Sequence, residues 1–554
     1  MRILVIGGVA GGASFAARAR RLSEDAEIVI FEKGDYVSFA NCGLPYHIGG
    51  EIAERASLLL HTPESLSSRF NLDVRIRSEV LSIERDRRVV HVRERITGRE
   101  YEEAYDQLVI ATGAAPVRPP IPGIDGEGIF SLRDISDMDQ IVSRLSRREA
   151  RKVVLVGGGY IGLELLEQLQ KTGSQVTLIE ALPQVMAPLD LEMAAHLHAE
   201  IRAHGVTLHL EEAVSEFVHI TNEAGDQQII VVTRGGLRVE ADLVVVAIGV
   251  RPESALARQA GLSLSERGAI KVNEHLQTED SAIWAIGDVI EVRQQPLELR
   301  GMVPLAGPAN RQGRMVADNM LGGFKRQYRG TWGTAALRLF NLTIACSGAN
   351  EKLLKREQVA YHAIFLHPNQ HAGYFPGAQS MAIKLLFSPI DRKVLGAQIV
   401  GNDGVDKRID VISTALQAQM TVDDLAELEL AYAPPIGSAK DPVNMAGMVA
   451  QNVLDGLVEI ADWSDVADLD PDCQLLDVRE SSEVERGIIP GALHMPLNSI
   501  RQRLSELPRD KPILVYCQSG QRSYIACRIL SQNGFNCRNL SGAYKTWSRV
   551  QSPG

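Results

Sequence analysis

The chain has 554 residues and a formal net charge of −11, with 45% hydrophobic and 23% charged residues. This composition is typical of globular proteins and excludes large-scale disorder, and the acidic balance argues against a general nucleic-acid binder. Because no run of about 18 apolar residues occurs, no membrane span is expected.

The length predicts three or four domains, each able to bury a core. Residues 1–7 read MRILVIG and lead directly into a strand and a glycine turn, so we expect no signal peptide. Six scattered cysteines fit a reducing compartment better than a disulfide framework. The sequence therefore predicts a cytoplasmic enzyme.

The first predicted unit is a strand, a glycine-rich turn, a helix and a second strand. An apolar run at residues 3–6 precedes GGVAGG at residues 7–12, and the strand at 27–31 ends at Glu32. Glycines let a pyrophosphate approach the backbone and a helix N-terminus, and the acidic residue accepts hydrogen bonds from ribose hydroxyls. Val9 replaces the usual middle glycine, so close approach at that position stays open.

Cys42 follows this unit in the segment SFANCGLPY, residues 38–46. A flavin disulfide reductase would carry a second cysteine five positions further on, where this chain has His47. A free cysteine is ordinarily a buried structural thiol, but the neighbours Asn41 and Gly43 and the place after a dinucleotide-binding unit favour a redox role. A helix N-terminus is expected to lower the pKa of the thiol.

The βαβ pattern occurs a second time. An apolar strand at residues 153–156 precedes GGGYIG at residues 157–162, and the strand at 176–179 ends at Glu180. Two such units predict two dinucleotide-binding domains. Glu180 would pair with a ribose 2′-hydroxyl and repel a 2′-phosphate, and Ala181 supplies no cation, so we expect NADH rather than NADPH.

Three further strand ends follow the same plan. They are DQLVIATG at residues 106–113, its near twin ADLVVVAIG at 241–249, and AIWAIGD at 282–288, which closes on Asp288. Singly, each could be a plain strand end. In this order, around two βαβ units, they resemble the flavoproteins of the pyridine nucleotide-disulfide oxidoreductase family over roughly residues 1–450.

The resemblance implies FAD on the first unit and NADH on the second, inserted one. Asp288 would bond the ribityl chain, the helix from Ala306 would point at the isoalloxazine ring, and Tyr160 would cover the flavin unless it is only a packed turn aromatic. The residues expected to bind FAD are Gly7, Gly8, Ala10, Gly11, Gly12, Glu32, Lys33, Ala111, Thr112, Gly113, Asp288 and Ala306. Those expected to bind NADH are Gly157, Gly159, Tyr160, Ile161, Gly162, Glu180 and Gly249.

The segment around Cys42 closely resembles that of coenzyme A-disulfide reductases, which use one cysteine that forms a mixed disulfide with coenzyme A. The resemblance implies that Tyr374 and Tyr432 are catalytic and come from the partner subunit of a homodimer. A tyrosine hydroxyl donates a proton without carrying charge, although isolated tyrosines are more often packing aromatics. The residues expected to line the coenzyme A path are Ser14, Arg18, Arg21, Ser38, Asn41 and Lys440.

The C-terminal segments LLDVRE at 475–480, GIIPGA at 487–492 and CQSGQR at 517–522 resemble a rhodanese domain. Backbone N–H groups of such a loop form an anion site at a helix N-terminus, which lowers the pKa of Cys517 and can hold a persulfide sulfur. Four residues separate Cys517 from Arg522, one fewer than in cysteine phosphatases, so the loop suits sulfur rather than phosphate. A degenerate domain used only for binding is the alternative.

Two sets of residues are expected to carry no chemistry. His367 and His371 are four apart, but neighbouring proline and glycine argue against a helix and no further ligand completes a site, so no metal is expected. The cysteines outside the two motifs lack C-x-x-C spacing and are expected to be buried or incidental thiols: Cys346, Cys473, Cys527 and Cys537.

The expected fold class is α/β, with two Rossmann-like dinucleotide-binding domains, an α+β dimerisation domain and a C-terminal α/β rhodanese domain. The predicted boundaries are 1–115 with 240–322 for FAD, 116–239 for NAD(P)H, 323–452 for dimerisation, 453–472 for a linker and 473–554 for rhodanese.

The sequence thus predicts an NADH-dependent persulfide reductase in which Cys42 reduces persulfides or polysulfides, such as coenzyme A persulfide, to sulfide and thiol. Cys517 would handle sulfane sulfur and deliver it to Cys42 directly or through a carrier. Three alternatives stay open: a coenzyme A-disulfide reductase, an NADH oxidase or peroxidase that cycles a sulfenic acid, and a sulfurtransferase with a sensing flavoprotein half.

Overall fold

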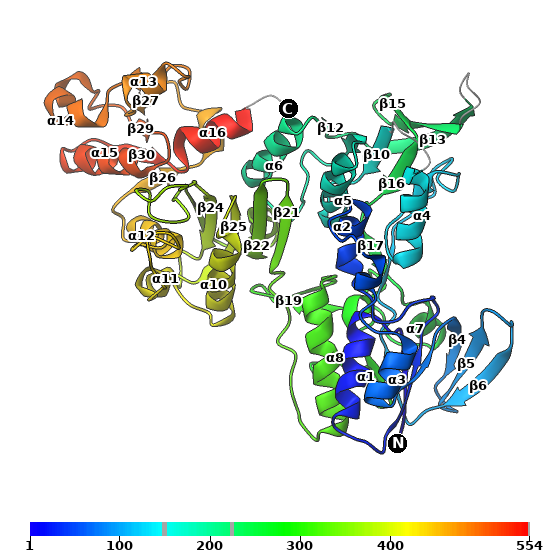
Figure 1. Ribbon diagram of the computed structural model, residues 1–554. Helices are drawn as coiled ribbons and strands as arrows, with labels where there is room; N and C mark the ends of the chain where they lie inside the picture. The colour runs from blue at the N-terminus through cyan, green and yellow to red at the C-terminus, as the bar shows by residue number, and fades with distance from the viewer. Residues whose placement is uncertain (147–151, 222–226, 552–554) are drawn as a thin grey trace. The chain divides into compact units, whose positions relative to one another are not determined.

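The computed structural model describes residues 1–146, 152–221 and 227–551. Two compact units form: unit 1 comprises Met1–Val185 and Val206–Gly333, and unit 2 comprises Met186–Gly205 and Thr334–Gly554. Figure 1 labels their helices and strands. Among the described residues, no helix has both the length and the apolar character needed to cross a membrane.

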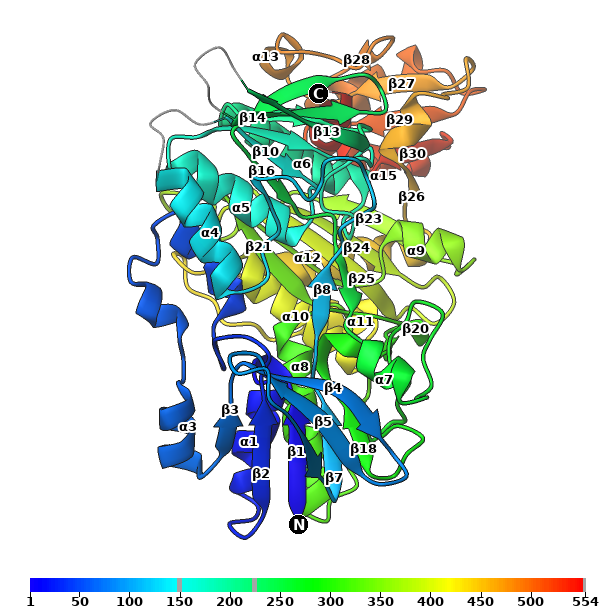
Figure 2. The same cartoon turned by 90° about the vertical axis from the view of Figure 1, so that its right-hand side faces the viewer.

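The first sheet of unit 1 has five parallel strands in the order β18-β7-β1-β2-β3 (Figure 2). Its strands are β1 (Arg2–Ile6), β2 (Glu27–Phe31), β3 (Asp73–Arg75), β7 (Gln107–Ile110) and β18 (Ile283–Ala285). Helices α1 (Ala10–Arg20) and α8 (Ala306–Leu321) lie side by side along it (Figure 1). The strands are almost wholly apolar and buried because helices and loops cover both faces of a parallel sheet.

The second sheet of unit 1 repeats this plan in the order β12-β11-β10-β16-β9. Its strands are β9 (Ile129–Phe130), β10 (Lys152–Val156), β11 (Gln175–Ile179), β12 (Thr207–His209) and β16 (Leu243–Val246), with helices α4 (Ile135–Ser146) and α5 (Tyr160–Lys171). Both predicted βαβ units are confirmed, because β1 pairs with β2 and β10 with β11 in parallel. Strand β1 lies between β2 and β7, and β10 lies between β11 and β16, so each sheet reverses its strand order at the strand that precedes a glycine turn, where α/β sheets bind nucleotides.

Smaller elements complete unit 1. Two antiparallel three-stranded sheets are formed by β4 (Ser78–Glu84), β5 (Val89–Glu94) and β6 (Glu100–Ala104), and by β13 (Val214–Thr221), β14 (Gln227–Thr233) and β15 (Arg238–Ala241). Two-stranded pairs are β8 (Ala114–Pro116) with β17 (Val250–Pro252) and β19 (Val292–Gln294) with β20 (Leu299–Gly301). The remaining α-helices are α2 (Leu44–Ile48), α3 (Pro63–Phe70) and α7 (Ala255–Gln259).

Unit 2 begins with an antiparallel sheet in the order β21-β22-β25-β24-β23. Its strands are β21 (Ala335–Leu339), β22 (Leu342–Gly348), β23 (His362–Leu366), β24 (Ala382–Phe387) and β25 (Val394–Gly401). The accompanying helices are α6 (Leu191–Ala203), α9 (Glu351–Arg356), α10 (Val405–Gln417), α11 (Val422–Glu427) and α12 (Pro442–Leu454). Helix α6 groups with this unit although the sequence places it within the predicted NAD(P)H-binding segment, because it packs on β25.

The C-terminal sheet of unit 2 has five parallel strands in the order β26-β30-β29-β27-β28. Its strands are β26 (Glu459–Ala461), β27 (Gln474–Asp477), β28 (Leu493–His494), β29 (Ile513–Tyr516) and β30 (Cys537–Leu540), and its helices are α13 (Ser481–Val484), α14 (Ile500–Arg503), α15 (Gln521–Gln532) and α16 (Ala543–Gln551). Strand β26 lies inside the segment predicted to be a linker. That segment is therefore partly an edge strand, which its pairing with β30 holds in place.

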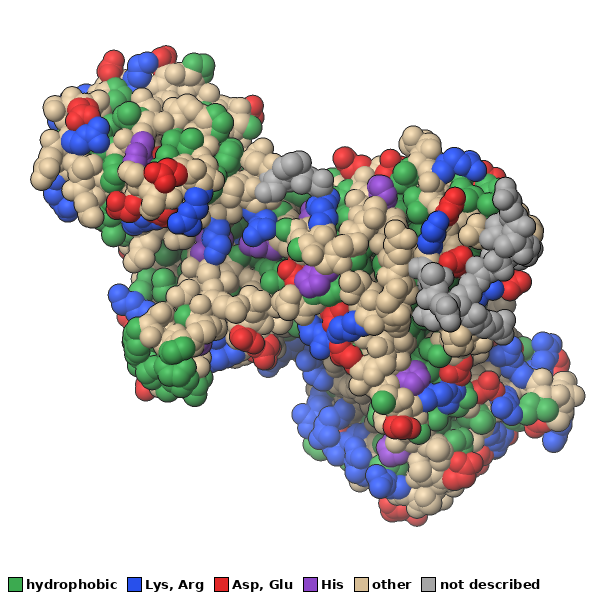
Figure 3. Space-filling view, turned by 45° about the horizontal axis from the view of Figure 1, so that its top comes forward, with side chains coloured by type: hydrophobic (Ala, Val, Ile, Leu, Met, Phe, Trp, Pro, Cys, Tyr) green, Lys and Arg blue, Asp and Glu red, His purple; other side chains and the backbone are tan. Residues whose placement is uncertain are grey.

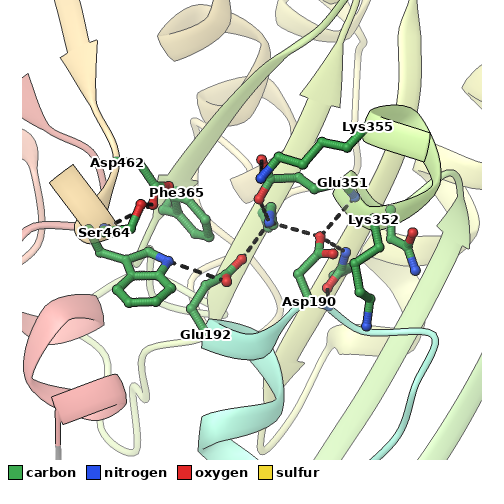
Figure 4. A network of polar contacts seen from close by, with 12 residues as sticks. Asp190, Glu192, Glu351, Lys352, Lys355, Phe365, Asp462 and Ser464 are labelled. Carbon is green, nitrogen blue, oxygen red and sulfur yellow. Dashed lines mark hydrogen bonds and ion pairs between the residues drawn. The ribbon is translucent and has the colours of Figure 1, made fainter. Parts of the chain in front are cut away.

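A buried ion network lies in unit 2 (Figure 4). The Lys384 ammonium on β24 is fully buried, lies 2.8 Å from Asp190 Oδ2, and also pairs with Glu192 and Glu351. Trp463 donates from its indole N–H to Glu192 at 3.3 Å. Within the described chain, this is the one group of acidic side chains close enough to hold a metal ion, and it surrounds an ammonium instead.

Helix α16 packs on the antiparallel part of unit 2. Thr546 Oγ1 lies 2.9 Å from His367 Nε2, and Lys545 donates to Ser380 Oγ at 2.8 Å. The Phe365 N–H donates to Ser541 Oγ at 2.9 Å. The two C-terminal parts of the chain therefore share a polar interface.

Candidate active site

Both glycine-rich turns have the same backbone geometry. Gly7 and Gly157 have φ of +101° and +104°, and a Cβ on them would lie 2.4 and 2.6 Å from a carbonyl oxygen that follows a neighbouring strand. A Cβ on Gly12 or Gly162 would lie 1.9 or 2.0 Å from the carbonyl oxygen of Gly7 or Gly157. Only glycine fits these four positions, because any side chain would separate the strand from the helix that follows it.

The valine in the first turn is accommodated. Val9 and Gly159 occupy the same place, the residue before α1 and α5, with φ of −98° and −81°. A Cβ at Gly159 would meet no protein atom within 4 Å, so a side chain here is compatible with the turn. Neither residue caps its helix through a side chain. Neither N-cap residue therefore occupies the helix start with its own side chain, which suits a pyrophosphate site.

The two predicted ribose ligands are held alike. Glu32 accepts hydrogen bonds from the N–H of Gly8 at 3.0 Å and from the N–H two residues further on at 2.8 Å. Glu180 accepts from the N–H of Gly158 at 2.6 Å and again from the N–H two residues further on at 2.8 Å. Each carboxylate is thus fixed at the end of the second strand, beside the glycine turn.

The other predicted flavin residues gather at the same sheet edge. Asp288 follows β18 in the 3₁₀ turn η3 (Gly287–Val289), and burial raises the pKa of its carboxyl to about 6. The Gly287 N–H donates to Gln312 of α8 at 2.7 Å, which ties this turn to the helix that begins at Ala306. The residues that follow β7 are Ala111, Thr112 and Gly113. Lys33 pairs at 2.5 Å with Glu253.

Cys42 lies in η1 (Asn41–Gly43), a 3₁₀ turn that leads into α2. Its N–H donates to the Asn41 side-chain oxygen at 3.1 Å, and its sulfur lies 3.8 Å from the same atom. The residue is exposed, so its sulfur is accessible from solvent.

The surroundings of Cys42 oppose ionisation. Nearby protein atoms displace enough solvent to raise the pKa of its thiol, and the carboxylates of Glu164 and Asp288 raise it further. The groups that the chain itself supplies therefore raise the pKa of Cys42, and the prediction that this pKa is lowered is wrong for them. A three-residue 3₁₀ turn followed by a five-residue helix supplies too few aligned peptide dipoles to outweigh two carboxylates.

Glu164 is a site residue that the sequence analysis missed. Helix α2 packs against α5, where a Cβ on Gly49 would lie 2.0 Å from the Gln168 side chain, and Tyr46 donates to Glu164 at 3.4 Å. Burial raises the pKa of Glu164 to about 7. Helix α5 begins at Tyr160, so Glu164 lies one helical turn after the second glycine turn. Through Tyr46, the same carboxyl also contacts the segment that carries Cys42. The available signal was a glutamate one turn after the second glycine motif, on the polar face of α5.

The predicted coenzyme A residues of unit 1 lie on α1, just beyond its end, and in the Cys42 segment. The Ser14 hydroxyl bonds Asn310 of α8, Arg18 pairs with the buried Asp318 at 2.7 Å, and Arg21 is exposed. Figure 3 shows Lys and Arg side chains gathered over the part of unit 1 that carries α1 and α8. This surface suits a polyphosphate, but Arg18 already has an acidic partner.

Ser38 contacts the first glycine turn, and Asn41 contacts Cys42. Ser38 adopts φ of +48°, and its N–H donates to the Gly8 carbonyl at 2.8 Å. This bond brings the segment that carries Cys42 onto the loop between β1 and α1.

The two predicted catalytic tyrosines meet in unit 2. Tyr374 and Tyr432 are 76% and 47% exposed, and their hydroxyls lie 3.0 Å apart, which raises the pKa of Tyr374. The Ala372 N–H donates to the Gly437 carbonyl at 2.8 Å, which links the two loops. Lys440 is exposed, three residues beyond this link.

A buried arginine fixes both tyrosine loops. The Arg408 guanidinium pairs with Asp441 at 2.8 Å and donates to the Gln370 carbonyl at 2.8 Å. Gln370 precedes the Tyr374 loop, and Asp441 follows the Tyr432 loop and caps α12. Through these two contacts, Arg408 holds the loops that carry the two tyrosine hydroxyls.

Cys517 lies at the carboxyl end of β29 and is fully buried. Its sulfur accepts from the Gly520 N–H at 3.1 Å and from the Ser523 hydroxyl at 3.4 Å. Gly520 has φ of +103°, which turns its N–H toward the sulfur. Arg522 makes two bonds of 2.6 and 2.7 Å to Glu483, so its charge is already paired. The loop has the shape of an anion site around sulfur.

The predicted site residues divide between the units. Cys42, Glu164 and the two glycine turns belong to unit 1, whereas Tyr374, Tyr432 and Cys517 belong to unit 2.

Three family models match the chain. Residues 1–313 match pyridine nucleotide-disulphide oxidoreductase, residues 334–442 match the dimerisation domain of that family, and residues 462–550 match the rhodanese-like domain.

Similar proteins cover most or all of the chain. A coenzyme A disulfide reductase of Staphylococcus haemolyticus is 36% identical, over 82% of this chain and all of its own length. Reduced Bacillus anthracis CoADR-RHD is 47% identical, with a TM-score of 0.96 over 99% of this chain and 98% of its own. A NAD-dependent persulfide reductase from A. fulgidus is 38% identical, with a TM-score of 0.92 over 99% of this chain and all of its own.

A less similar solved structure belongs to an enzyme with a different reaction. The water-forming NADH oxidase from Lactobacillus brevis is 27% identical, with a TM-score of 0.78 over 82% of this chain. The family model covers more than half of the chain and the predicted fold class is confirmed. The chain belongs to the pyridine nucleotide-disulphide oxidoreductase family and carries a C-terminal rhodanese-like domain.

Proposed function

We propose that this protein is an NADH-dependent flavoprotein that reduces thiol persulfides, such as coenzyme A persulfide, to sulfide and thiol. Cys42 is the redox cysteine and Cys517 handles sulfane sulfur. The observation that carries the proposal is the presence, on one chain, of an accessible single cysteine beside the first dinucleotide turn and an intact sulfur-binding loop. Full-length similarity to a persulfide reductase supports it.

The nucleotide turns fit FAD and NADH. Helix starts without side-chain caps face each turn, and Glu32 and Glu180 stand where ribose hydroxyls would bind. Asp288 and the start of α8 would hold the flavin end, and Tyr160 the nicotinamide side. When bound, the two cofactors supply hydride transfer and two electrons for disulfide reduction.

The chain's own residues account for the sulfur chemistry. The Cys42 thiolate attacks the inner sulfur of a thiol persulfide, forms a mixed disulfide with the thiol and displaces hydrosulfide. Tyr374 and Tyr432 donate a proton to the leaving sulfur, since their hydroxyls share a hydrogen bond that raises the pKa of Tyr374. Ser38, Asn41, Arg21 and Lys440 line the path of coenzyme A.

The tyrosines act from a partner subunit. Tyr374 and Tyr432 are exposed in unit 2 together with Phe375 and Ile436, an apolar group that a homodimer would bury. The matched dimerisation domain supports this assembly.

Steady-state NADH oxidation tests the proposal. Coenzyme A persulfide, coenzyme A disulfide, oxygen and peroxide are compared as acceptors, and the persulfide is expected to give the highest kcat/KM. Cys42→Ser should abolish turnover with every acceptor. Cys517→Ser should impair polysulfide reduction selectively, and an equal loss on all acceptors would contradict the separate role of Cys517.

A second candidate is a coenzyme A-disulfide reductase. It is favoured by the 36% identity to such an enzyme over 82% of the chain. In that case coenzyme A disulfide exceeds the persulfide in kcat/KM and Cys517→Ser leaves its reduction unchanged.

A further inference from the structure

Two cysteines with no place in this scheme meet in the rhodanese-like domain. Cys527 lies in the middle of α15, and Cys537 begins β30, which packs against that helix. The Cys537 thiol donates to the Cys527 carbonyl at 3.5 Å, so its sulfur lies beside the residue that carries the second thiol. The sequence analysis expected both to be incidental, because ten residues separate them and no C-x-x-C spacing links them.

The two thiols are not equivalent. Cys527 is 2% exposed, whereas Cys537 is partly exposed and accessible to small molecules. The interaction between the two side chains lowers the pKa of Cys537 and raises that of Cys527, and burial raises the pKa of Cys527 further. An accessible, more acidic thiol beside a buried, less acidic one is the arrangement of a nucleophilic and a resolving cysteine.

We propose that Cys527 and Cys537 form a redox-active dithiol that persulfides or polysulfides convert to an intramolecular disulfide. This site lies outside the Cys42 and Cys517 centres and needs no electrons from NADH. The Cys537 sulfur lies 3.5 Å from the Cys527 carbonyl oxygen, and Cys537 is only partly buried at the start of β30, so a small side-chain movement has to bring the two sulfurs to the roughly 2.0 Å of an S–S bond.

The reaction balances with sulfane sulfur as the oxidant. The Cys537 thiolate attacks the outer sulfur of R–S–SH, forms a Cys537 persulfide and releases RS⁻, which takes up the Cys527 proton. The Cys527 thiolate then attacks the Cys537 Sγ, forms the disulfide and expels HS⁻. Two cysteine thiols are oxidised, and the sulfane sulfur takes both electrons and leaves as sulfide.

Tryptic mapping of the full-length holoenzyme tests the site. The protein is reduced, desalted without oxygen, treated with sodium tetrasulfide and blocked with iodoacetamide. Cleavage after Arg522, Arg528 and Arg538 places Cys527 in peptide 523–528 and Cys537 in peptide 529–538. We expect these two peptides linked by a disulfide, two hydrogens lighter than their sum, and the loss of two titratable thiols per chain.

Three variants sharpen the result. Cys527→Ser should leave Cys537 as a persulfide, one sulfur heavier, and Cys537→Ser should leave Cys527 as an unmodified thiol. Cys473→Ser, in the same domain, should still form the link. Diamide, which oxidises dithiols without sulfur transfer, should close the pair in the wild type.

The inference is overturned if neither tetrasulfide nor diamide produces the linked peptides. Persulfidation of Cys517 in the same digest reports the proposed function separately. A modified Cys517 without the link contradicts only the dithiol, and the link without a modified Cys517 contradicts only the role of Cys517.

Discussion

The pKa of the Cys42 thiol is raised first by burial and then by two carboxyl groups remote from it in sequence. Glu164 and Asp288 both raise the pKa of its thiol, and both carry raised pKa values themselves, about 7 and about 6, because they are buried. The chain alone therefore holds Cys42 protonated at neutral pH. Activation of the thiol has to come from groups that bind beside it.

Removing one carboxyl should acidify the thiol. Glu164 is ionised where Cys42 titrates, so Glu164→Gln is expected to lower the Cys42 pKa, because one of the two carboxylates that raise it is removed. The pH dependence of alkylation by iodoacetamide, followed on the Cys42 peptide, measures it. Glu51→Gln, a carboxyl that pairs with Lys171 beyond α2, is the control and should leave the profile unchanged. An identical profile for both variants would show that Glu164 does not act on the thiol.

The same residue predicts how stability depends on pH in the flavin-free protein. The Glu164 pKa is raised from 4.5 to about 7 in the folded chain, so the folded state binds this proton more tightly than the unfolded state. Its contribution is complete below pH 4.5 and is lost as pH rises through about 7; it amounts to at most roughly 3 kcal/mol. Urea midpoints between pH 5 and 7.5 should fall less in Glu164→Gln than in wild type. Parallel curves would refute this linkage.

At the scale of elements, single strands and helices are joined by buried charges. Lys384 on β24 connects α6, through Asp190 and Glu192, to α9, through Glu351. The ammonium keeps the pKa of Asp190 and Glu351 below their ordinary values despite burial, which by itself raises both. Arg408 likewise joins the two tyrosine loops, through its ion pair with Asp441 and its hydrogen bond to the Gln370 carbonyl.

Lys384→Met should destabilise unit 2 strongly. The substitution leaves the buried carboxyl groups of Asp190 and Glu192 without their cation, and Glu351 with only Lys355 at the surface, which costs about 3–5 kcal/mol. Lys355→Met is the matched control, because Lys355 pairs with the same Glu351 from the surface and should contribute at most about 0.5 kcal/mol. The urea midpoint and the melting temperature of each variant measure the difference. Equal effects would mean that burial of the ammonium contributes nothing.

At the scale of the whole molecule, the proposed site needs Cys42 from unit 1 and the tyrosines from unit 2 of another copy. An isologous dimer supplies two such sites. The two copies can therefore be made defective in different residues.

Complementation between subunits tests this assembly. Cys42→Ser and the double variant Tyr374→Phe, Tyr432→Phe are each expected to lose most activity, whereas coexpression should restore about a quarter of it, because half the dimers are mixed and each has one intact site. Differently tagged subunits allow mixed dimers to be purified and their NADH turnover measured. Failure of purified mixed dimers to exceed either parent would place cysteine and tyrosines in the same subunit.

The sequence by itself determined the two nucleotide turns, the Cys42 segment and the Cys517 loop. These features are local: Gly7 and Gly157 are needed for a positive φ, and Cys517 to Arg522 form one continuous loop, so spacing along the chain is sufficient to identify them. The matching places of Val9 and Gly159 also follow from the turn, although only the structure shows that a side chain fits there.

The tertiary structure alone decided which distant residues meet. Tyr46 with Glu164, Lys384 with Asp190, and Cys527 with Cys537 are brought together by helices packing on helices or sheets, and no periodicity in the sequence encodes such partners. The strand β26 inside the predicted linker depends likewise on pairing with a strand some 80 residues later. Burial at those contacts then set the protonation of Cys42 and its neighbours, because desolvation depends on the packed surroundings and not on residue type.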